Sequence, residues 1–137
     1  MMLTCEEVMK HPLVTVTESD EVGLAEDLLR QHGFRHVPVV KEGKLVGLLT
    51  QRDILSRACW PREAAIGEAM VRNVTTVRPG TPVRHAARIM RANRISCLPV
   101  VDAERKLLGL ITEADLVELA GDLAEELDRE DLQICRG

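Results

Sequence analysis

The sequence contains two copies of one unit, and this duplication constrains the fold more than any other feature. Residues 37–40 (Val-Pro-Val-Val) match residues 98–101 (Leu-Pro-Val-Val), and residues 47–53 match residues 109–115, starting at glycine and ending at aspartate in both copies. A copy of about 60 residues is too small to enclose a sizeable core by itself. We therefore expect the two copies to bury their apolar faces against each other as one fold made of two halves.

Three short apolar segments in each copy predict strands. In the first copy they span residues 13–17, 35–40 and 45–49, and residues 41–44 (Lys-Glu-Gly-Lys) have the composition of a hairpin turn. A helix between the first two strands predicts a right-handed crossover, so these two strands should be parallel. A second helix after Thr50 completes the order β-α-β-β-α, which predicts the α+β class.

Capping residues predict the helix boundaries. Ser19 precedes the first long helix as its N-cap, and Gly33 should end it. In the second copy, Thr81 stands before a proline, the pattern of an N-cap followed by proline at the first helical position, and Asn93 stands where that helix should end.

Composition excludes several classes of partner. A formal charge of −4, with one Phe, one Trp and no Tyr, argues against nucleic-acid binding. No segment approaches the roughly 20 apolar residues that span a bilayer, and the N-terminus has no secretory pattern. The cysteines are too far apart to indicate a metal site or a disulfide framework. We expect a cytoplasmic protein with reduced thiols at Cys5, Cys59, Cys97 and Cys135.

The duplicated motifs resemble those of the cystathionine-β-synthase (CBS) domain pair, or Bateman module. The resemblance covers residues 4–120 and rests on Met9, Met70, the two Pro-Val-Val strands and the two Gly-x-x-Thr-x-x-Asp segments. It implies two tandem repeats packed about a pseudo-twofold axis, with clefts that in other members hold AMP, ADP, ATP, S-adenosylmethionine or NAD. The corresponding division is repeat 1 at 1–60, repeat 2 at 61–120 and an acidic C-terminal helical tail at 121–137.

The two Thr-x-x-Asp pairs are candidates for ligand contact. Thr50 with Asp53, and Thr112 with Asp115, stand at strand-to-helix junctions, where helix-start amides favour an anion. A carboxylate there would repel phosphate, whereas it would accept the hydroxyls of a ribose diol. The same pattern also caps a helix and stabilises it by about 1 kcal/mol without any ligand. The residues alone leave both roles open, and the resemblance favours ligand binding.

The resemblance assigns phosphate binding to the residues before each Pro-Val-Val strand. Repeat 1 has Arg35 and His36 there, and repeat 2 has Ser96 and Cys97, so we expect tighter binding in the cleft with the basic pair. The alternative for this pair is a solvated strand end or an ion pair with the acidic tail. A His36 in contact with phosphate would bind more tightly at lower pH. Some members hydrogen-bond the ligand through a Thr at the position of Met70, which Met cannot do.

Two clefts follow from this resemblance, each built from both repeats. The first comprises Arg35, His36, Leu48, Thr50, Asp53, Val74, Thr75, Ile95, Ser96 and Cys97. The second comprises Val14, Thr15, Phe34, Thr112 and Asp115.

These observations predict a non-enzymatic energy or metabolite sensor that binds an adenosine nucleotide or S-adenosylmethionine and requires no cofactor or metal. The alternative is a ligand-free module for protein interaction or dimerisation, in which the Thr-x-x-Asp pairs serve only as caps. An enzyme is disfavoured because the sequence clusters no base with a nucleophile. The expected partners are the small molecule, a second copy in a homodimer and a regulated protein, with neither nucleic acid nor membrane.

The C-terminal segment 113–131 combines leucines at helical spacing with many acidic residues. We expect the leucines to pack on the module or on a second copy, and the acidic face to be solvated. The alternative is a docking helix for a basic partner, because acidic residues near a helix C-terminus are unfavourable with the helix dipole. The leucines are Leu116, Leu119, Leu123 and Leu127.

Overall fold

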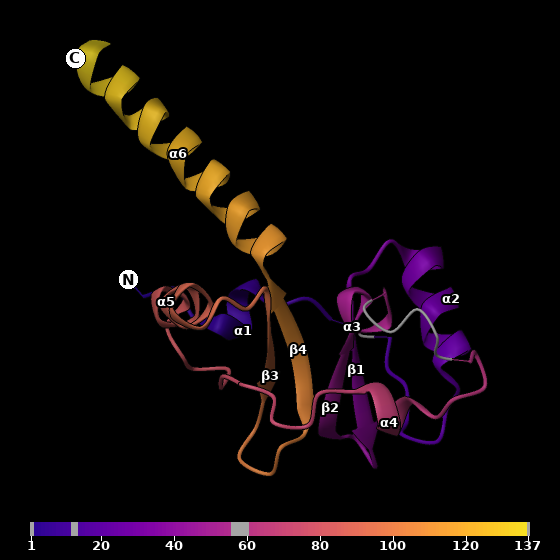
Figure 1. Ribbon diagram of the computed structural model, residues 1–137. Helices are drawn as coiled ribbons and strands as arrows, with labels where there is room; N and C mark the ends of the chain where they lie inside the picture. The colour runs from indigo at the N-terminus through magenta and orange to yellow at the C-terminus, as the bar shows by residue number, and fades with distance from the viewer. Residues whose placement is uncertain (1, 12–13, 56–60, 137) are drawn as a thin grey trace.

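The computed structural model describes residues 2–11, 14–55 and 61–136, with side chains up to residue 131. The same order of elements occurs twice along the chain, which confirms the predicted α+β class (Figure 1). The first series is α1 (Cys5–Val8), α2 (Val22–His32), β1 (His36–Lys41), β2 (Lys44–Thr50) and α3 (Gln51–Leu55). The second is α4 (Ile66–Ala69), α5 (Val83–Asn93), β3 (Cys97–Val101), β4 (Leu107–Thr112) and α6 (Glu113–Arg136).

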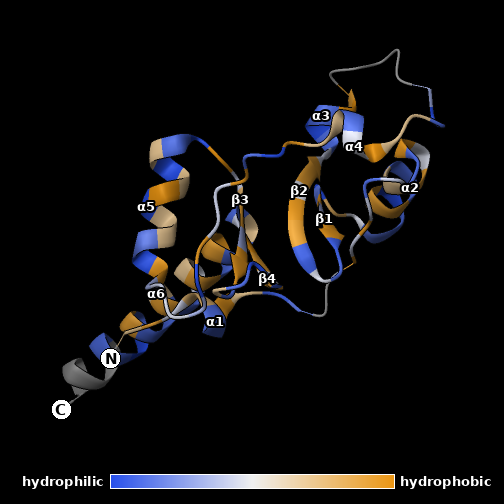
Figure 2. Ribbon diagram, turned by 90° about the horizontal axis from the view of Figure 1, so that it is seen from below, coloured by the Kyte–Doolittle hydropathy of each residue, from blue (hydrophilic) through white to orange (hydrophobic). Residues whose placement is uncertain are grey.

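Each repeat contains one antiparallel hairpin, β1–β2 or β3–β4. Val39 pairs with Gly47 in the first hairpin and Val100 pairs with Gly109 in the second, and an irregularity follows that valine in both. The predicted strands 35–40 and 45–49 are confirmed to within one residue at each end. The hairpins lie together in the centre of the molecule, and the helices lie on the two outer sides (Figure 2).

The strand predicted over 13–17 is present only as a single bridge. Val16 pairs with Val39, and Val77 pairs with Val100, both in parallel orientation. Val16 and Val77 each make two backbone hydrogen bonds to the hairpin of their repeat, between 2.9 and 3.1 Å long. The predicted direction is therefore confirmed and the predicted length is wrong, because only one residue per repeat bonds to the hairpin. Leu13 lies outside the described residues.

The predicted helix ends are confirmed. Gly33 follows α2 in the left-handed conformation (φ 69°), and its N–H donates to the Leu29 carbonyl. Helix α5 ends at Asn93, and Arg94 adopts the same left-handed conformation (φ 53°).

The predicted start of the helix after Thr50 is confirmed, whereas the predicted starts of α2 and α5 are wrong, and backbone carbonyls explain why. Glu21, rather than Ser19, is the N-cap of α2, and Pro82, rather than Thr81, is the N-cap of α5. The first amide of α2 donates to the Ala64 carbonyl (2.8 Å), and that of α5 donates to the Leu3 carbonyl (2.9 Å). Segments from the other repeat therefore satisfy the amides that a side-chain cap would otherwise serve.

The short leading helices are exchanged between the repeats. Helix α1 packs on repeat 2, where Cys5 joins the buried cluster of Val77, Ala86, Leu98 and Ile111. Helix α4 packs on repeat 1, where Ile66 joins the buried cluster of Val16, Ala25, Val37 and Leu49. Backbone bonds fix both positions, from Cys5 N–H to the Thr81 carbonyl (2.8 Å) and from Ile66 N–H to the Asp20 carbonyl (2.9 Å). Each core is therefore completed by the other repeat.

A methionine after each exchanged helix covers a glycine of the opposite hairpin. A Cβ built on Gly109 would lie 2.5 Å from Sδ of Met9, and one built on Gly47 would lie 2.5 Å from Sδ of Met70. These two strand positions have no room for a side chain, so the close approach of the methionines requires glycine.

The last helix only partly packs on the module. Leu116 packs against the core of repeat 2 and Leu119 is half-buried, as predicted. Leu123 and Leu127 remain 47% and 62% exposed, so the expected packing of the leucines on the module ends after Leu119. Helix α6 then extends away from the other elements (Figure 1).

Replacement of Gly47 by alanine should lower the free energy of unfolding by about 1–3 kcal/mol. The added methyl group would meet Sδ of Met70 and, at 3.0 Å, the carbonyl oxygen of Val71. Chemical denaturation measures the change. Gly80→Ala is the matched control, because nothing lies within 4 Å of a Cβ at that position. Equal losses in the two variants, or no loss in Gly47→Ala, would contradict the packing account.

Candidate functional site

The two Thr-x-x-Asp pairs form reciprocal caps at the strand-to-helix junctions. Oδ2 of Asp53 accepts the N–H (3.2 Å) and the hydroxyl (2.8 Å) of Thr50, while Oγ1 of Thr50 accepts the Asp53 N–H (3.0 Å). Thr112 and Asp115 repeat these contacts at 2.9, 3.1 and 3.4 Å. The capping role considered for these pairs is thus present in both repeats, and ligand contact would be an additional role.

The two aspartates have different surroundings. Asp115 is only 7% exposed, and its Oδ1 lies 3.5 Å from Nζ of Lys10, in the segment that follows the exchanged helix α1. Lys10 follows Met9, whereas Val71 occupies the corresponding place after Met70. Asp53 is half-buried. A lysine therefore compensates the charge of Asp115, and the apolar Val71 cannot do the same in the other repeat.

The residues before the two Pro-Val-Val strands meet at the interface between the repeats, which we call the seam. Nε2 of His36 lies 3.0 Å from Oγ of Ser96, a hydrogen bond between the first and second hairpins. The carbonyl of Arg35 accepts the N–H of Gln51 (2.9 Å), and the carbonyl of Ser96 accepts the N–H of Glu113 (3.0 Å). These bonds place both segments beside the helix starts that follow Thr50 and Thr112.

Burial changes the protonation of two groups in this seam. It lowers the pKa of His36 below its ordinary value, assisted by the charge of Arg35 and opposed by Asp53 and Glu113. Burial also raises the pKa of the Cys97 thiol to about 12, with a further contribution from Asp115. At neutral pH the imidazole of His36 is therefore neutral and offers a hydrogen bond, as it does to Ser96. Its contact with phosphate stays a prediction.

Apolar side chains from both repeats close the centre of the seam. Leu48 of β2, Cys97 of β3 and Leu110 of β4 form one buried cluster, and Val74 packs against it. Three of these four residues belong to the predicted first cleft. The structure thus brings together Leu48, Val74 and Cys97, and the hydrogen bond brings together His36 and Ser96.

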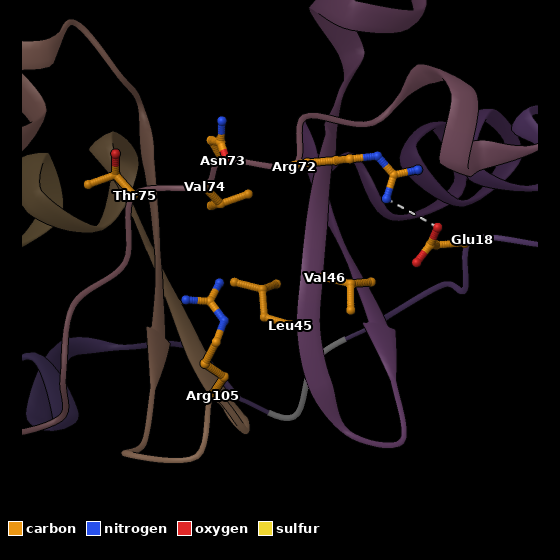
Figure 3. Close-up of a pocket in the computed structure, with 8 residues that line it drawn as sticks. All are labelled: Glu18, Leu45, Val46, Arg72, Asn73, Val74, Thr75 and Arg105. Carbon is orange, nitrogen blue, oxygen red and sulfur yellow. Dashed lines mark hydrogen bonds and ion pairs between the residues drawn. The ribbon is translucent and has the colours of Figure 1, made fainter.

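A groove of about 590 Å³ opens beside the start of β2 (Figure 3). Figure 3 shows Leu45 and Val46 on opposite sides of the β2 ribbon, Asn73 and Val74 above them, Thr75 farther along the same segment and Arg105 from the opposite hairpin. Arg72 and Glu18 form an ion pair (3.2 Å) at its edge. Val74 and Thr75 are the predicted site residues that line it. The groove lies near the beginning of β2, whereas Thr50 and Asp53 lie at the end of that strand and just beyond it.

Sequence reasoning missed the other lining residues: Glu18, Leu45, Val46, Arg72, Asn73 and Arg105. Arg105 reaches the groove because the two hairpin turns bond to each other, with Leu45 N–H donating to the Arg105 carbonyl (3.0 Å). No repeated motif marks any of these six residues. Arg72 and Asn73 could have been predicted from their positions just before Val74 and Thr75, whereas the sequence held no signal for the other four.

The remaining predicted site residues are dispersed. Ile95 packs against the core of repeat 2. Phe34 is 45% exposed and stacks on His32, with ring centroids 5.1 Å apart. Val14 is half-buried, and Arg35 and Thr15 are exposed.

Cys5 and Cys97 are buried free thiols. Cys59 and the side chain of Cys135 lie outside the described residues. Within residues 2–11, 14–55 and 61–136, no group of three His, Cys, Asp or Glu residues could hold a metal ion. No helix in the described part of the chain is long and apolar enough to cross a membrane.

The chain belongs to the CBS domain family, whose model matches residues 5–58 and 66–122. It is 36% identical over 117 residues to L-aspartate semialdehyde sulfurtransferase of Methanocaldococcus jannaschii, covering 85% of this chain and 23% of that protein. It is 32% identical over 114 residues to inosine-5′-monophosphate dehydrogenase of the same organism, covering 82% and 23%. The chain thus spans about a quarter of the length of these relatives.

Solved structures share the whole fold. A CBS domain pair crystallised with 5′-methylthioadenosine and S-adenosyl-L-methionine superimposes with a TM-score of 0.82 at 33% identity, covering 89% of this chain and 98% of that one. A putative acetoin utilization protein of Vibrio cholerae gives 0.85 at 32% identity, covering 94% and 98%. CBSX2 in complex with AMP gives 0.81 at 27% identity, covering 89% and 98%. The predicted CBS-pair fold is confirmed.

The lowered pKa of His36 predicts a pH dependence of stability. The unfolded state binds the proton of His36 more tightly than the folded state does. The stability that depends on a neutral His36 is therefore fully present above pH 6.5, and it is lost as the pH falls through the lower pKa of the folded state. His36→Gln keeps a partner for Ser96 without titrating, and it should lose less stability than the wild type between pH 7.5 and 5.5. Denaturant unfolding at both values measures this. The exposed His85→Gln should behave as the wild type; identical slopes in all three proteins would exclude the effect.

Proposed function

We propose that this chain is a non-enzymatic regulatory module that binds an adenosine-containing small molecule between its two CBS repeats. The groove beside β2 carries this proposal, because residues of both repeats line it and its volume lies within the range of about 300–1,000 Å³ typical of small-molecule sites. Structural neighbours crystallised with S-adenosyl-L-methionine and 5′-methylthioadenosine, or with AMP, support an adenosine ligand.

The chemistry of the seam suits a nucleoside. Leu45, Val46 and Val74 offer aliphatic contact to one end of an extended ligand, and Asn73 and Thr75 offer hydrogen-bonding groups beside them. The carboxylate of Asp53 would accept the ribose hydroxyls at the other end of the ligand, beyond Thr50, which lies about 16 Å from Leu45 along β2. Arg105 lines the groove with a guanidinium group that would attract an anionic ligand. In this proposal the ligand lies along β2 and contacts the first cleft more tightly than the second, where Lys10 already pairs with Asp115.

Binding would regulate by favouring one arrangement of the repeats over another. The repeats meet at the His36–Ser96 bond and at the cluster around Leu48. A ligand in contact with both repeats would shift their relative positions only as far as its affinity differs between the two arrangements. We place this module in the cytoplasm, keep the division at 1–60, 61–120 and 121–137, and propose that the regulated protein and a second copy are its macromolecular partners.

The second candidate is a ligand-free interaction or dimerisation module. The complete caps at Thr50–Asp53 and Thr112–Asp115 favour it, because both pairs have a structural role without any ligand.

A ligand panel separates the two candidates. AMP, ADP, ATP, S-adenosylmethionine and NAD are each tested by thermal shift and calorimetry. At a hundredfold excess over its dissociation constant, a bound ligand adds about 2.7 kcal/mol to stability, which raises the melting temperature by several degrees in a domain of this size. No shift with any of the five would reject the sensor and leave the interaction module.

Paired aspartate variants test the site. Asp53→Asn should weaken binding of the active ligand roughly 10–100-fold, the value of a hydrogen bond to a charged group. Asp115→Asn is the matched control, because it alters the equivalent cap in the other repeat and should leave the tight site intact. Calorimetry well below the melting temperature separates binding from stability. Unchanged affinity in Asp53→Asn, or equal losses in both variants, would reject the assignment.

A further inference from the structure

Lys10 contacts the carboxylate oxygen of Asp115 that its helix cap does not use. Oδ2 of Asp115 accepts the N–H (2.9 Å) and the hydroxyl (3.1 Å) of Thr112, whereas Oδ1 lies 3.5 Å from Nζ of Lys10. The same ammonium group lies 4.0 Å from Oε2 of Glu118, so it contacts two carboxylates. Because the side chain of Asp115 is only 6% exposed, its charge depends on this nearby cation for compensation.

The backbone places position 71 in repeat 2 just as it places position 10 in repeat 1. Lys10 exchanges two backbone hydrogen bonds with Leu110 (2.9 and 3.3 Å), and Val71 exchanges two with Leu48 (2.9 and 3.0 Å). Each of these residues therefore lies beside the strand that leads to one Thr-x-x-Asp junction. The difference between the two positions is in the side chain, which is a cation at one and an apolar group at the other.

The ammonium group of Lys10 competes with a ribose for Asp115. A carboxylate binds a ribose by accepting hydrogen bonds from its hydroxyl groups, and Lys10 already supplies donors to Oδ1. Since Lys10 is attached to the same chain, it is present at a high effective concentration whatever the ligand concentration is. Glu118 also holds this lysine in place, and the sequence has Ser56 at the equivalent place in the other repeat.

We propose that residues 10 and 71 determine which of the two Thr-x-x-Asp junctions binds a ribose. Lys10 closes the junction at Asp115, and Val71 leaves the junction at Asp53 open to the ligand. This inference rests on the proposed function, and it adds that the chain binds one adenosine ligand. A tethered cation, and not a missing carboxylate, then makes the two halves of the duplicated sequence unequal.

Introducing the lysine into the other repeat gives the first test. Val71→Lys should weaken binding at Asp53 at least about tenfold, the value of a lost hydrogen bond to a charged group. Calorimetry uses AMP and S-adenosylmethionine as separate probes. AMP is the more stringent of the two, because a lysine would otherwise attract its phosphate. Val71→Met is the matched control: it has an unbranched side chain without the ammonium group and should keep the wild-type affinity.

Removing the lysine gives the reciprocal test. Lys10→Met retains an unbranched aliphatic side chain but has no ammonium group, so a second binding event should appear in the calorimetric titration. Adding Asp115→Asn to this variant should abolish the second event and leave the first. Lys41→Met, at an exposed position of the first hairpin, is the control and should bind one ligand. An ion pair that only stabilised the fold would leave the number of bound ligands unchanged.

The outcomes separate this inference from the proposed function. If wild-type protein binds neither probe nor any other member of the ligand panel, the proposed function is rejected and this inference is rejected with it. Two ligands per wild-type chain, one ligand in folded Lys10→Met, or unchanged affinity in Val71→Lys would overturn this inference alone. Circular dichroism melting checks folding. If Lys10→Met does not fold, Val71→Lys decides, because Val71 is 46% exposed and tolerates a longer side chain.

Discussion

The exchange of the leading helices between repeats is the interaction on which the rest of the structure depends. Cys5 and Ile66 are fully buried, each in the core of the other repeat. Met9 and Met70 then cover Gly109 and Gly47 so closely that a methyl group has no room. Because backbone carbonyls of the exchanged segments also receive the first amides of α2 and α5, each repeat lacks both part of its core and a helix cap without the other. This explains how two units of such small size form one stable fold.

The same exchange creates the proposed site. After Met70 the chain pairs with β2 at Val71 and Leu48, which brings residues 72–75 of repeat 2 alongside a strand of repeat 1. The groove is therefore shared by both repeats, and a ligand in it would respond to their relative position. The exchange also produces asymmetry, because the equivalent segment of repeat 1 carries Lys10, which pairs with Asp115. One duplicated sequence thus yields two unequal seams.

Local patterns in the sequence predicted local structure well. The hairpins, the left-handed Gly33 and the Thr-x-x-Asp junctions depend on residues close together in the chain. The N-caps predicted at Ser19 and Thr81 were wrong because carbonyls from distant segments accept hydrogen bonds from the first amides of these helices. The position of Arg105 in the groove could not be predicted for a similar reason, since it depends on contact between the two hairpin turns, which are far apart in the sequence. The protonation of His36 depends on burial across the seam, which its sequence neighbours do not reveal.

An NMR titration of the backbone amides tests the central claim most directly. A saturating adenosine ligand should shift amides of both repeats together, at residues 45–53 along β2 and α3 and at residues 72–75 opposite. The amide resonances of α2, on the outer side of repeat 1, should not shift. Shifts confined to one repeat, or no shift with any ligand of the panel, would contradict a binding site formed between the two repeats.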